Sequence, residues 1–260
     1  MEKVIFLGYG PLAEYALGVL KSGCEVIFEA HDKGDLAEVC RMKRENPEAH
    51  GVLASFGVMI SAEVLELFEP EGILNIHPSV LPLYRGPSPI ETAILDGCSE
   101  FGVSVMKLVP KMDAGPIYWQ TTVFDLPLEK MAIYQGLAEA GAKWICDNLA
   151  NLPTPIAQDE SKATYCNKLD KAMGVLQPET DTAEQTLRKI IAFQGFPKPK
   201  YAFYGKNCII LEAHMLKVGE TAVLPLECAG GQILSIDRLQ PEGRKSMDAK
   251  AFLNGYSRGK

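Results

Sequence analysis

The stretch Asn75-Ile-His77-Pro78-Ser-Val-Leu-Pro-Leu-Tyr-Arg-Gly-Pro87 carries the most informative pattern in the chain. It follows Ile73-Leu74, a short apolar run that is typical of a buried strand. Asn75 and His77 are two residues apart, so on an extended backbone their side chains leave the same face. Pro78 cannot donate to a sheet, so the strand should end just past His77. We therefore expect an amide and an imidazole at the carboxyl end of a strand, where open α/β sheets bind their ligands. A histidine that is only hydrogen-bonded within a turn is the alternative interpretation.

The bulk properties are those of a soluble globular protein. The chain has 260 residues, 47% of them hydrophobic and 23% charged, which suffices for one large domain or for a large and a small one. Seven cysteines are scattered singly without CxxC spacing, which indicates reduced thiols rather than disulfides or a zinc site. No signal peptide opens the sequence, and no apolar run approaches the ~18 residues of a membrane span. We expect a cytoplasmic protein that does not bind membranes.

The charge is distributed unevenly along the chain. The whole chain has a net charge of −7, but residues 181–260 hold 12 Lys and Arg against 8 Asp and Glu, a net charge of +4. Residues 1–180 therefore carry −11. A basic C-terminal region on an acidic body suggests a polyanionic partner, although solvated surfaces produce such differences too.

The N-terminal pattern begins with a buried strand, Lys3–Gly8, a helix over residues 13–20 and a second strand over residues 24–28. The turn Gly8-x-Gly10-x-x-Ala13 matches the dinucleotide fingerprint, with an acidic residue about 20 positions later. An NAD(P)-dependent oxidoreductase is one hypothesis. A tight turn that binds nothing is the other, since its geometry requires glycine as well.

Further apolar runs extend this arrangement through the first two thirds of the chain. Strands are predicted over residues 51–56, 73–77, 101–108 and 117–123, and helices over residues 62–68, 89–95 and 130–149. Strands that alternate with helices predict an α/β fold with a doubly wound, mainly parallel, Rossmann-like sheet. We assign residues 1–160 to this domain.

The amino-acid composition changes near residue 150, where prolines and a polar run mark a connector. We place a linker at residues 161–180. A capped helix follows at residues 182–193. Short alternating stretches then occupy residues 201–203, 207–215, 222–226 and 232–239. This spacing favours a small antiparallel barrel or sandwich at residues 181–260, and we predict a small, OB-like β-barrel.

Asp113 is the third polar residue of interest. It lies on a turn after the strand over residues 101–108, and we expect it at the same edge of the sheet as His77. A carboxylate there can hold an imidazole in one tautomer and stabilise its cation. Asn75 can donate a hydrogen bond to an oxyanion. Together the three residues suit acyl transfer to an amine, because no hydrolase elbow and no nearby cysteine supplies a nucleophile.

At these residues the chain resembles the 10-formyltetrahydrofolate-dependent formyltransferases. The resemblance is carried by residues 75–90, 102–106 and 113–116, and it continues through residues 159–165, 189–193, 239–247 and 252–255. It covers most of both predicted domains. The Asn-x-His-Pro-Ser pattern with a downstream Asp is far more specific than the Gly8-x-Gly10 turn, which carries no dinucleotide in that family.

The resemblance implies a role for each residue of the trio. Asn75 would donate to the developing oxyanion, and His77 would stabilise that charge and take part in proton transfer from the attacking amine. Asp113 would orient His77. The resemblance also implies contacts with the folate co-substrate from Phe56, Met59, Ile60, Ser79, Val80, Leu81, Pro82, Leu108 and Met112. It implies no metal.

Within that family, the pattern is most similar to enzymes whose acceptor is the amino group of methionyl initiator tRNA. We expect a monomer that binds this tRNA through its basic C-terminal domain. Two departures bear on the acceptor: the segment His31–Gly51 is shorter than the basic segment of those enzymes, and Leu176-Gln177 replaces their acidic-Trp pair. An amino sugar on a nucleotide is the alternative acceptor. An RNA-binding protein with an inactive catalytic fold is disfavoured by the intact trio.

Overall fold

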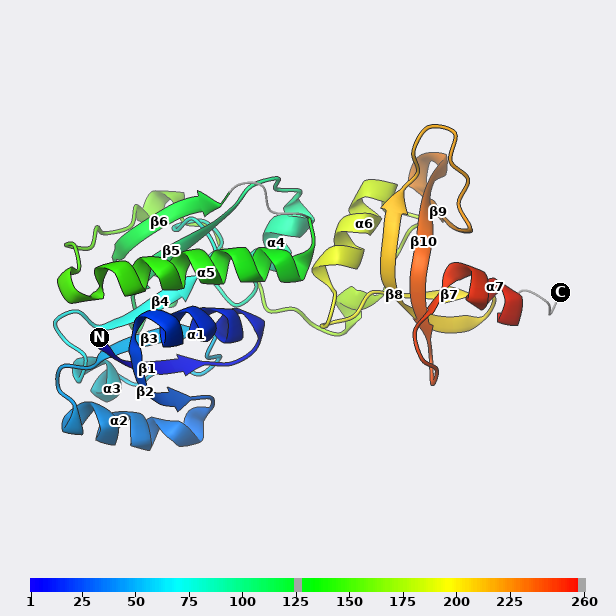
Figure 1. The fold of residues 1–260 in the computed structure, drawn as a ribbon. Helices are drawn as coiled ribbons and strands as arrows, with labels where there is room; N and C mark the ends of the chain where they lie inside the picture. Colours follow the sequence, from blue (N-terminus) through cyan, green and yellow to red (C-terminus); the bar gives the residue numbers. More distant parts are fainter. Residues whose placement is uncertain (124–127, 257–260) are drawn as a thin grey trace. The chain divides into compact units, whose positions relative to one another are not determined.

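A computed structural model describes residues 1–123 and 128–256 and divides the chain into two compact units (Figure 1). The first comprises Met1–Ala93 and Ser99–Asn167, and the second comprises Ile94–Cys98 and Lys168–Lys260. The predicted fold class is confirmed: a mainly parallel sheet with helices is followed by an antiparallel, barrel-like sheet. The domain limits at residues 160 and 180 stay a prediction. Within the described residues, every helix is too short or too polar to span a membrane.

The first unit is built on a six-stranded sheet in the order β2-β1-β3-β4-β5-β6. Its strands are β1 (Lys3–Gly8), β2 (Glu25–Ala30), β3 (His50–Ala54), β4 (Ile73–His77), β5 (Phe101–Lys107) and β6 (Ile117–Val123). The strands β2, β1, β3 and β4 run parallel to one another. The pairs β4–β5 and β5–β6 are antiparallel. The sheet therefore changes from parallel to antiparallel at β4.

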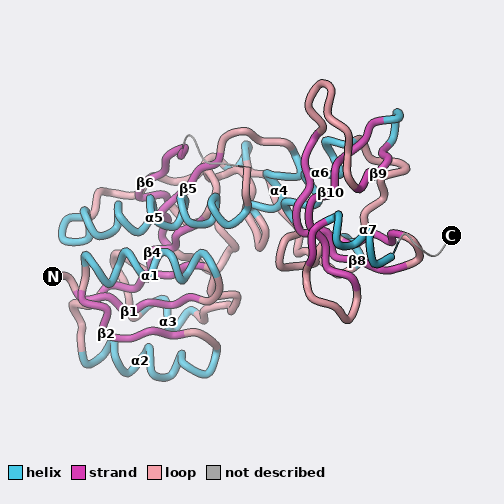
Figure 2. The backbone as a smooth tube through the Cα atoms, turned by 45° about the vertical axis from the view of Figure 1, so that its right-hand side comes forward, coloured by secondary structure: helices cyan, strands magenta, loops and turns pink. Residues whose placement is uncertain are grey.

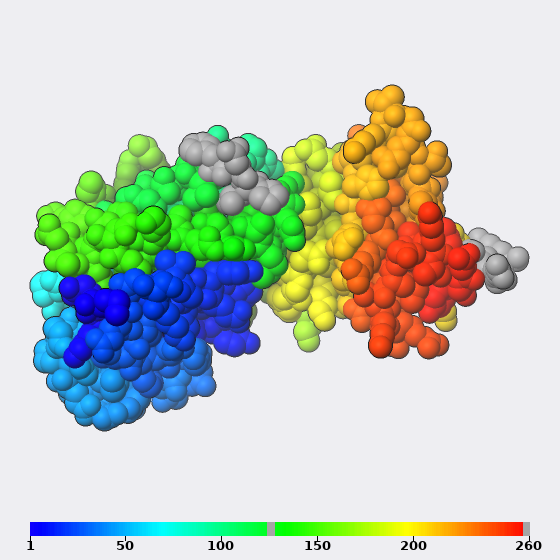
Figure 3. Space-filling view, viewed as in Figure 1, coloured from blue at the N-terminus to red at the C-terminus, as the bar shows by residue number. Residues whose placement is uncertain are grey.

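Helices cover both faces of this sheet. They are α1 (Pro11–Gly23), α2 (Leu36–Glu45), α3 (Ala62–Glu66) and α5 (Lys130–Asn148), and α4 (Pro89–Asp96) connects β4 to β5. Ile5 and Leu7 of β1 share a core with Val39 of α2 and Val64 of α3. The helices α1 and α5 lie side by side (Figures 1 and 2). In the space-filling view their residues cover much of the side of the first unit that faces the reader (Figure 3).

The Gly-rich turn after β1 has a structural explanation. A Cβ at Gly8 would lie 2.6 Å from the carbonyl oxygen of Ala54 and 2.7 Å from the Cβ of Ala13. Gly10 has a φ of +82°, which favours glycine, and Pro11 starts α1 with its fixed φ. Close packing and a left-handed backbone therefore account for both glycines.

The second unit has an antiparallel sheet in the order β11-β10-β8-β7, with β9 paired to β10. Its elements are α6 (Ala183–Ala192), β7 (Lys200–Phe203), β8 (Lys206–Met215), β9 (Leu224–Cys228), β10 (Gln232–Pro241), β11 (Met247–Asp248) and α7 (Ala249–Tyr256). A capping box between Thr182 and Gln185 starts α6, as its sequence indicates. Ile190 of α6 and Phe252 of α7 are buried against the sheet.

Two elements of this unit, β11 and α7, are not predicted by the sequence. The strand has only two residues, too few to show alternation. The helix has eight, and only Ala249 and Phe252 are fully buried, so its apolar stripe is narrow. Its first turn is fixed by a local contact instead, since the Ala251 amide donates to Asp248 Oδ1 at 2.7 Å.

Candidate active site

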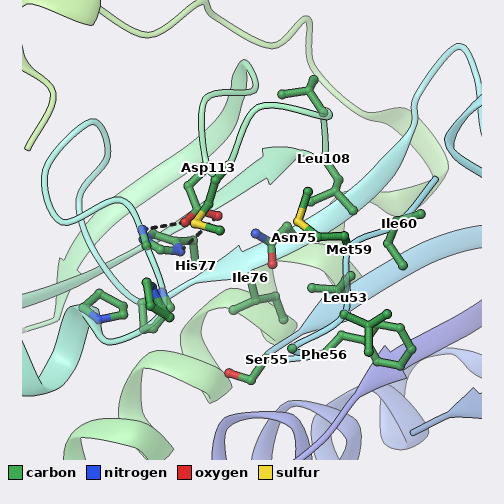
Figure 4. A pocket seen from close by; sticks show the side chains of 18 of the residues that line it. Leu53, Ser55, Phe56, Met59, Ile60, Asn75, Ile76, His77, Leu108 and Asp113 are labelled. Carbon is green, nitrogen blue, oxygen red and sulfur yellow. Dashed lines mark hydrogen bonds and ion pairs between the residues drawn. The ribbon is translucent and has the colours of Figure 1, made fainter. Parts of the chain in front are cut away.

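The strand β4 presents the two polar side chains that the sequence singles out. All of β4 is buried, and Asn75 and His77 pair with Met106 and Ser104 of β5. Both side chains line a cavity of about 420 Å³ (Figure 4). An apolar strand with two inward polar groups therefore forms the floor of a pocket.

The ring of His77 is held by a backbone carbonyl. The side chain is almost fully buried, and its Nε2 lies 3.0 Å from the carbonyl oxygen of Tyr84. A carbonyl oxygen can only accept, so Nε2 carries a hydrogen. Nδ1 faces Oδ1 of Asp113 at 3.7 Å. Tyr84 thus sets the tautomer, and the orienting role of Asp113 stays a prediction.

Asp113 reaches His77 by a route that the sequence did not suggest. We expected it at the sheet edge where β4 ends, but β5 is antiparallel to β4 and places Lys107 beside Leu74. The loop between Leu108 and Pro116 therefore returns along β4. Asp113 has a left-handed backbone with a φ of +49°, which Asp tolerates. Its Oδ2 accepts a 2.7 Å hydrogen bond from the Gly86 amide.

Asn75 supplies the side-chain amide of the site. The residue is 6% exposed, and its amide forms no hydrogen bond with any described residue. Figure 4 shows it between the His77–Asp113 pair and the apolar side chains of Met59 and Ile60. Among the described residues, every fully buried side-chain nitrogen or oxygen has a hydrogen-bond partner, so the Asn75 amide atoms are open to the cavity that the residue lines. Asn75 is therefore available to a molecule in the cavity.

The apolar wall of the cavity contains most of the residues for which the resemblance implies folate contacts. Phe56, Met59, Ile60, Leu108 and Met112 all line it. Phe56 and Ile60 are buried, whereas Met59 is 67% and Met112 is 53% exposed. The wall thus combines a fixed apolar base with two flexible methionines from separate loops.

The structure does not bring Ser79, Val80, Leu81 or Pro82 into the lining of this cavity. Ser79 Oγ donates to the Leu83 carbonyl at 2.6 Å, and the Leu81 amide donates to Ser104 Oγ of β5 at 3.0 Å. These contacts fold the loop back onto the sheet. The loop leads to Tyr84, whose amide donates to Thr164 Oγ1 at 2.8 Å and whose carbonyl lies beside His77.

Several other lining residues escaped the sequence interpretation. Ser55 follows β3 directly, and the carboxyl end of that strand was the available signal. Tyr134 of α5, which has the spacing of a core residue, also lines the cavity. Its hydroxyl donates to Oε1 of Glu91 at 2.9 Å, and burial raises the pKa of Tyr134 well above its usual range.

The chemistry available to this site follows from the trio. A neutral His77 with hydrogen on Nε2 leaves Nδ1 free to accept a proton, and Asp113 stabilises the cation that results. Asn75 can donate to an oxygen that becomes negative. The described residues contain no group of three or more His, Cys, Asp or Glu side chains that could hold a metal. The geometry suits acyl transfer to an amine.

Comparison with known families gives two matches. Residues 18–149 match the formyl transferase family, and residues 168–257 match the C-terminal domain of formyl transferases. Methionyl-tRNA formyltransferase of Methylobacillus flagellatus is 34% identical over 239 residues, which cover 85% of this chain and 75% of that protein.

Solved structures share the fold. Methionyl-tRNA formyltransferase from Clostridium thermocellum superposes with a TM-score of 0.64 at 18% identity, covering 95% of this chain and 99% of that one. HypX from Aquifex aeolicus, in complex with tetrahydrofolic acid, gives a TM-score of 0.74 at 20% identity. That match covers 98% of this chain and 47% of HypX, so the chain spans about half the length of HypX.

Proposed function

The chain belongs to the formyl transferase family and is therefore an enzyme that transfers formyl groups, and we propose that it formylates methionyl initiator tRNA with 10-formyltetrahydrofolate. The observation that carries this proposal is the 34% identity, over 85% of the chain, to a methionyl-tRNA formyltransferase. The trio of Asn75, His77 and Asp113 supplies groups suited to the reaction.

The cavity fits a folate donor. Its volume of about 420 Å³ and its largely apolar wall suit a flat ring system, and the polar groups are gathered beside Asn75. Leu108 and Phe56 offer apolar surface to such a ring. HypX, which has the same fold, has been captured with tetrahydrofolic acid. We propose that the formyl group of the donor lies between Asn75 and His77.

Transfer joins the acceptor nitrogen to the formyl carbon and breaks the bond from that carbon to N10 of the folate. Asn75 donates to the formyl oxygen as negative charge develops there. Nδ1 of His77 accepts the proton that the amine loses. Asp113, whose Oδ1 is 3.7 Å from Nδ1, stabilises the imidazolium until the proton passes to the leaving N10.

One observation favours a smaller acceptor, an amino sugar on a nucleotide. The segment His31–Gly51 has basic residues that could meet tRNA, but two are engaged internally. Arg41 is held by Glu38 and Glu45. Lys43 Nζ donates to the carbonyls of Pro47 and Ala49, each at 2.6 Å, and lies over the Phe68 ring. These cations have little capacity left for phosphate.

The deciding experiment offers the enzyme 10-formyltetrahydrofolate with a labelled formyl group and one acceptor at a time. We expect label in charged methionyl initiator tRNA, and none in uncharged tRNA or in an amino-sugar nucleotide. Asp113→Asn, which removes the carboxylate beside His77, is the matched control and should label the same acceptor much more slowly. Label only in the sugar nucleotide would move the function to the alternative acceptor.

A further inference from the structure

The side chain of Gln158 joins the two loops that surround His77. Its Nε2 donates to the backbone carbonyls of Asp113 and Gly115, at 2.8 and 2.7 Å. Its Oε1 accepts from Nε and Nη2 of Arg85, at 3.0 and 2.7 Å. Both amide hydrogens and the amide oxygen are thus engaged, which fixes the orientation of the side chain.

Arg85 is the fixed support on the other side. Its side chain is 0% exposed, although it carries a permanent charge. Nη1 and Nη2 also donate to the carboxylate of Glu160, at 3.2 and 2.8 Å. Arg85 and Lys111 together lower the pKa of Glu160 to about 2, so this carboxylate is ionised across the physiological range.

Arg85 lies in the loop whose backbone contacts both His77 and Asp113. It lies between Tyr84, whose carbonyl accepts from His77, and Gly86, whose amide donates to the Asp113 carboxylate. Gln158 therefore ties the backbone of Asp113 to the same short loop that already holds both His77 and the Asp113 side chain.

We propose that Gln158 is a positioning residue, which aims Asp113 at Nδ1 of His77 by holding the 113–115 backbone against Arg85. This inference rests on the proposed formyl transfer and deepens it. Asp113 has a left-handed backbone and lies in a loop outside the sheet. Without the Gln158 amide, two carbonyls lose their donors and the carboxylate is free to drift from the imidazole.

Gln158→Glu tests this directly. Glutamate has the same shape and keeps an oxygen for Arg85, but it turns a second acceptor oxygen toward the carbonyls of Asp113 and Gly115. If Gln158 only accepts hydrogen bonds from Arg85, the variant should work as well as the wild type. If it aims Asp113, kcat should fall roughly 10- to 100-fold, because displacement by about 1 Å has that effect. The KM for 10-formyltetrahydrofolate should change less than about threefold, because the apolar wall is intact.

Glu160→Gln is the matched control. It alters the other partner of the same guanidinium and leaves the two bonds from Gln158 to the loop in place. We expect kcat within about twofold of wild type. A further check is Gln158→Glu combined with Asp113→Asn: the double variant should be no slower than Asp113→Asn alone, because one residue acts through the other.

A readout that needs no acceptor is hydrogen exchange at the Gly86 amide, which Asp113 protects. We expect faster exchange there in Gln158→Glu and wild-type exchange in Glu160→Gln.

Gln158→Met, which has neither donor nor acceptor at the amide positions, serves if Gln158→Glu does not fold. A lower kcat together with faster exchange at the Gly86 amide in Gln158→Glu supports the inference. Wild-type turnover, unchanged Gly86 exchange or additive losses with Asp113→Asn would overturn it. A wild-type enzyme that formylates neither acceptor would refute the proposed function, and Gly86 exchange would still decide the role of Gln158.

Discussion

At the scale of single residues, the Tyr84 carbonyl does most to define what His77 can do. By accepting from Nε2 at 3.0 Å it leaves Nδ1 as the only ring nitrogen that can take a proton. His77 lines the cavity, and this nitrogen lies 3.7 Å from Oδ1 of Asp113. The proton acceptor and the group that stabilises its cation are thereby arranged before any substrate binds.

Asn75→Ala removes the one amide donor of the trio. We expect kcat to fall about 10²- to 10³-fold, since the loss of an oxyanion donor has that effect. Folate affinity, followed by fluorescence titration, should stay close to wild type because Asn75 adds little to the apolar wall. Asn148→Ala, at the end of α5 and outside the cavity lining, is the control. Near-normal turnover in Asn75→Ala would rule out the assigned role.

Gly8 and Gly10 of the first turn are needed for different reasons, close packing at Gly8 and a positive φ at Gly10. Gly8→Ala drives a Cβ to within 2.6 Å of the Ala54 carbonyl, so we expect a loss of about 1–3 kcal/mol in the free energy of unfolding. Gly10→Ala meets no atom within 4 Å, but its φ of +82° with a ψ of −172° is a backbone conformation that essentially only glycine adopts, so we expect a loss of about 1–3 kcal/mol from backbone strain alone. Urea denaturation measures both. An unchanged free energy of unfolding in either variant would contradict the reason given for that glycine.

At the scale of elements, the strands and most helices follow from the sequence, but the direction of β5 does not. The alternation at residues 101–107 is the same in a parallel or an antiparallel strand. Direction depends on how the connection from β4 returns, which is a property of the tertiary fold. The sequence therefore identified Asp113 as a candidate, but its path to His77 became clear only from the register Leu74–Lys107.

The Ser79–Pro82 loop shows the same limit in another form. Its closeness in sequence to His77 and its resemblance to a folate-contacting segment both suggested the cavity wall. Ser104, 25 residues further on, accepts from the Leu81 amide and donates to the Ser79 carbonyl at 2.7 Å. The sequence around residues 79–82 does not indicate Ser104 as a hydrogen-bond partner, so the contact of this loop with β5 could not be predicted.

The pairing of β8 with β10 includes a titratable cluster. His214 Nδ1 lies 2.7 Å from Asp237 and its Nε2 lies 3.0 Å from Glu220. Hydrogen bonds to Asp237 and then Glu220 raise the pKa of His214 above its ordinary value of 6.5. Its stabilising contribution is therefore complete below pH 6.5 and is lost as the pH rises through the raised value.

His214→Gln should accordingly lower stability at pH 6 and have little effect at pH 9. The side chain is 38% exposed, so we expect a difference of at most about 1 kcal/mol. Thermal unfolding at the two pH values measures it. His50, whose pKa is lowered mainly by burial, is a contrasting control: His50→Gln should relieve a loss of stability at acid pH. A pH-independent effect of His214→Gln would contradict the assignment.

At the scale of the whole molecule, composition predicted a basic C-terminal region but not which cations are free. Arg41 and Lys43 in the acidic first unit are engaged by neighbouring groups. On and beside β7, Lys198, Lys200 and Lys206 are exposed and pair with no carboxylate among the described residues. Such differences depend on which side chains the fold brings together, so counting charges along the sequence cannot reveal them.

We therefore expect tRNA affinity to depend on these three lysines. Binding to methionyl initiator tRNA should weaken steeply with salt, and each phosphate contact removed should reduce the slope of log K against log salt by about 1. The triple variant Lys198→Glu, Lys200→Glu, Lys206→Glu should lower both affinity and slope. Lys143→Glu with Lys162→Glu, where each lysine already pairs with an aspartate, is the matched control in the first unit. A flat salt response in the wild type would favour a small acceptor. Binding of a small acceptor involves few contacts between lysines and phosphates, so its affinity depends little on salt.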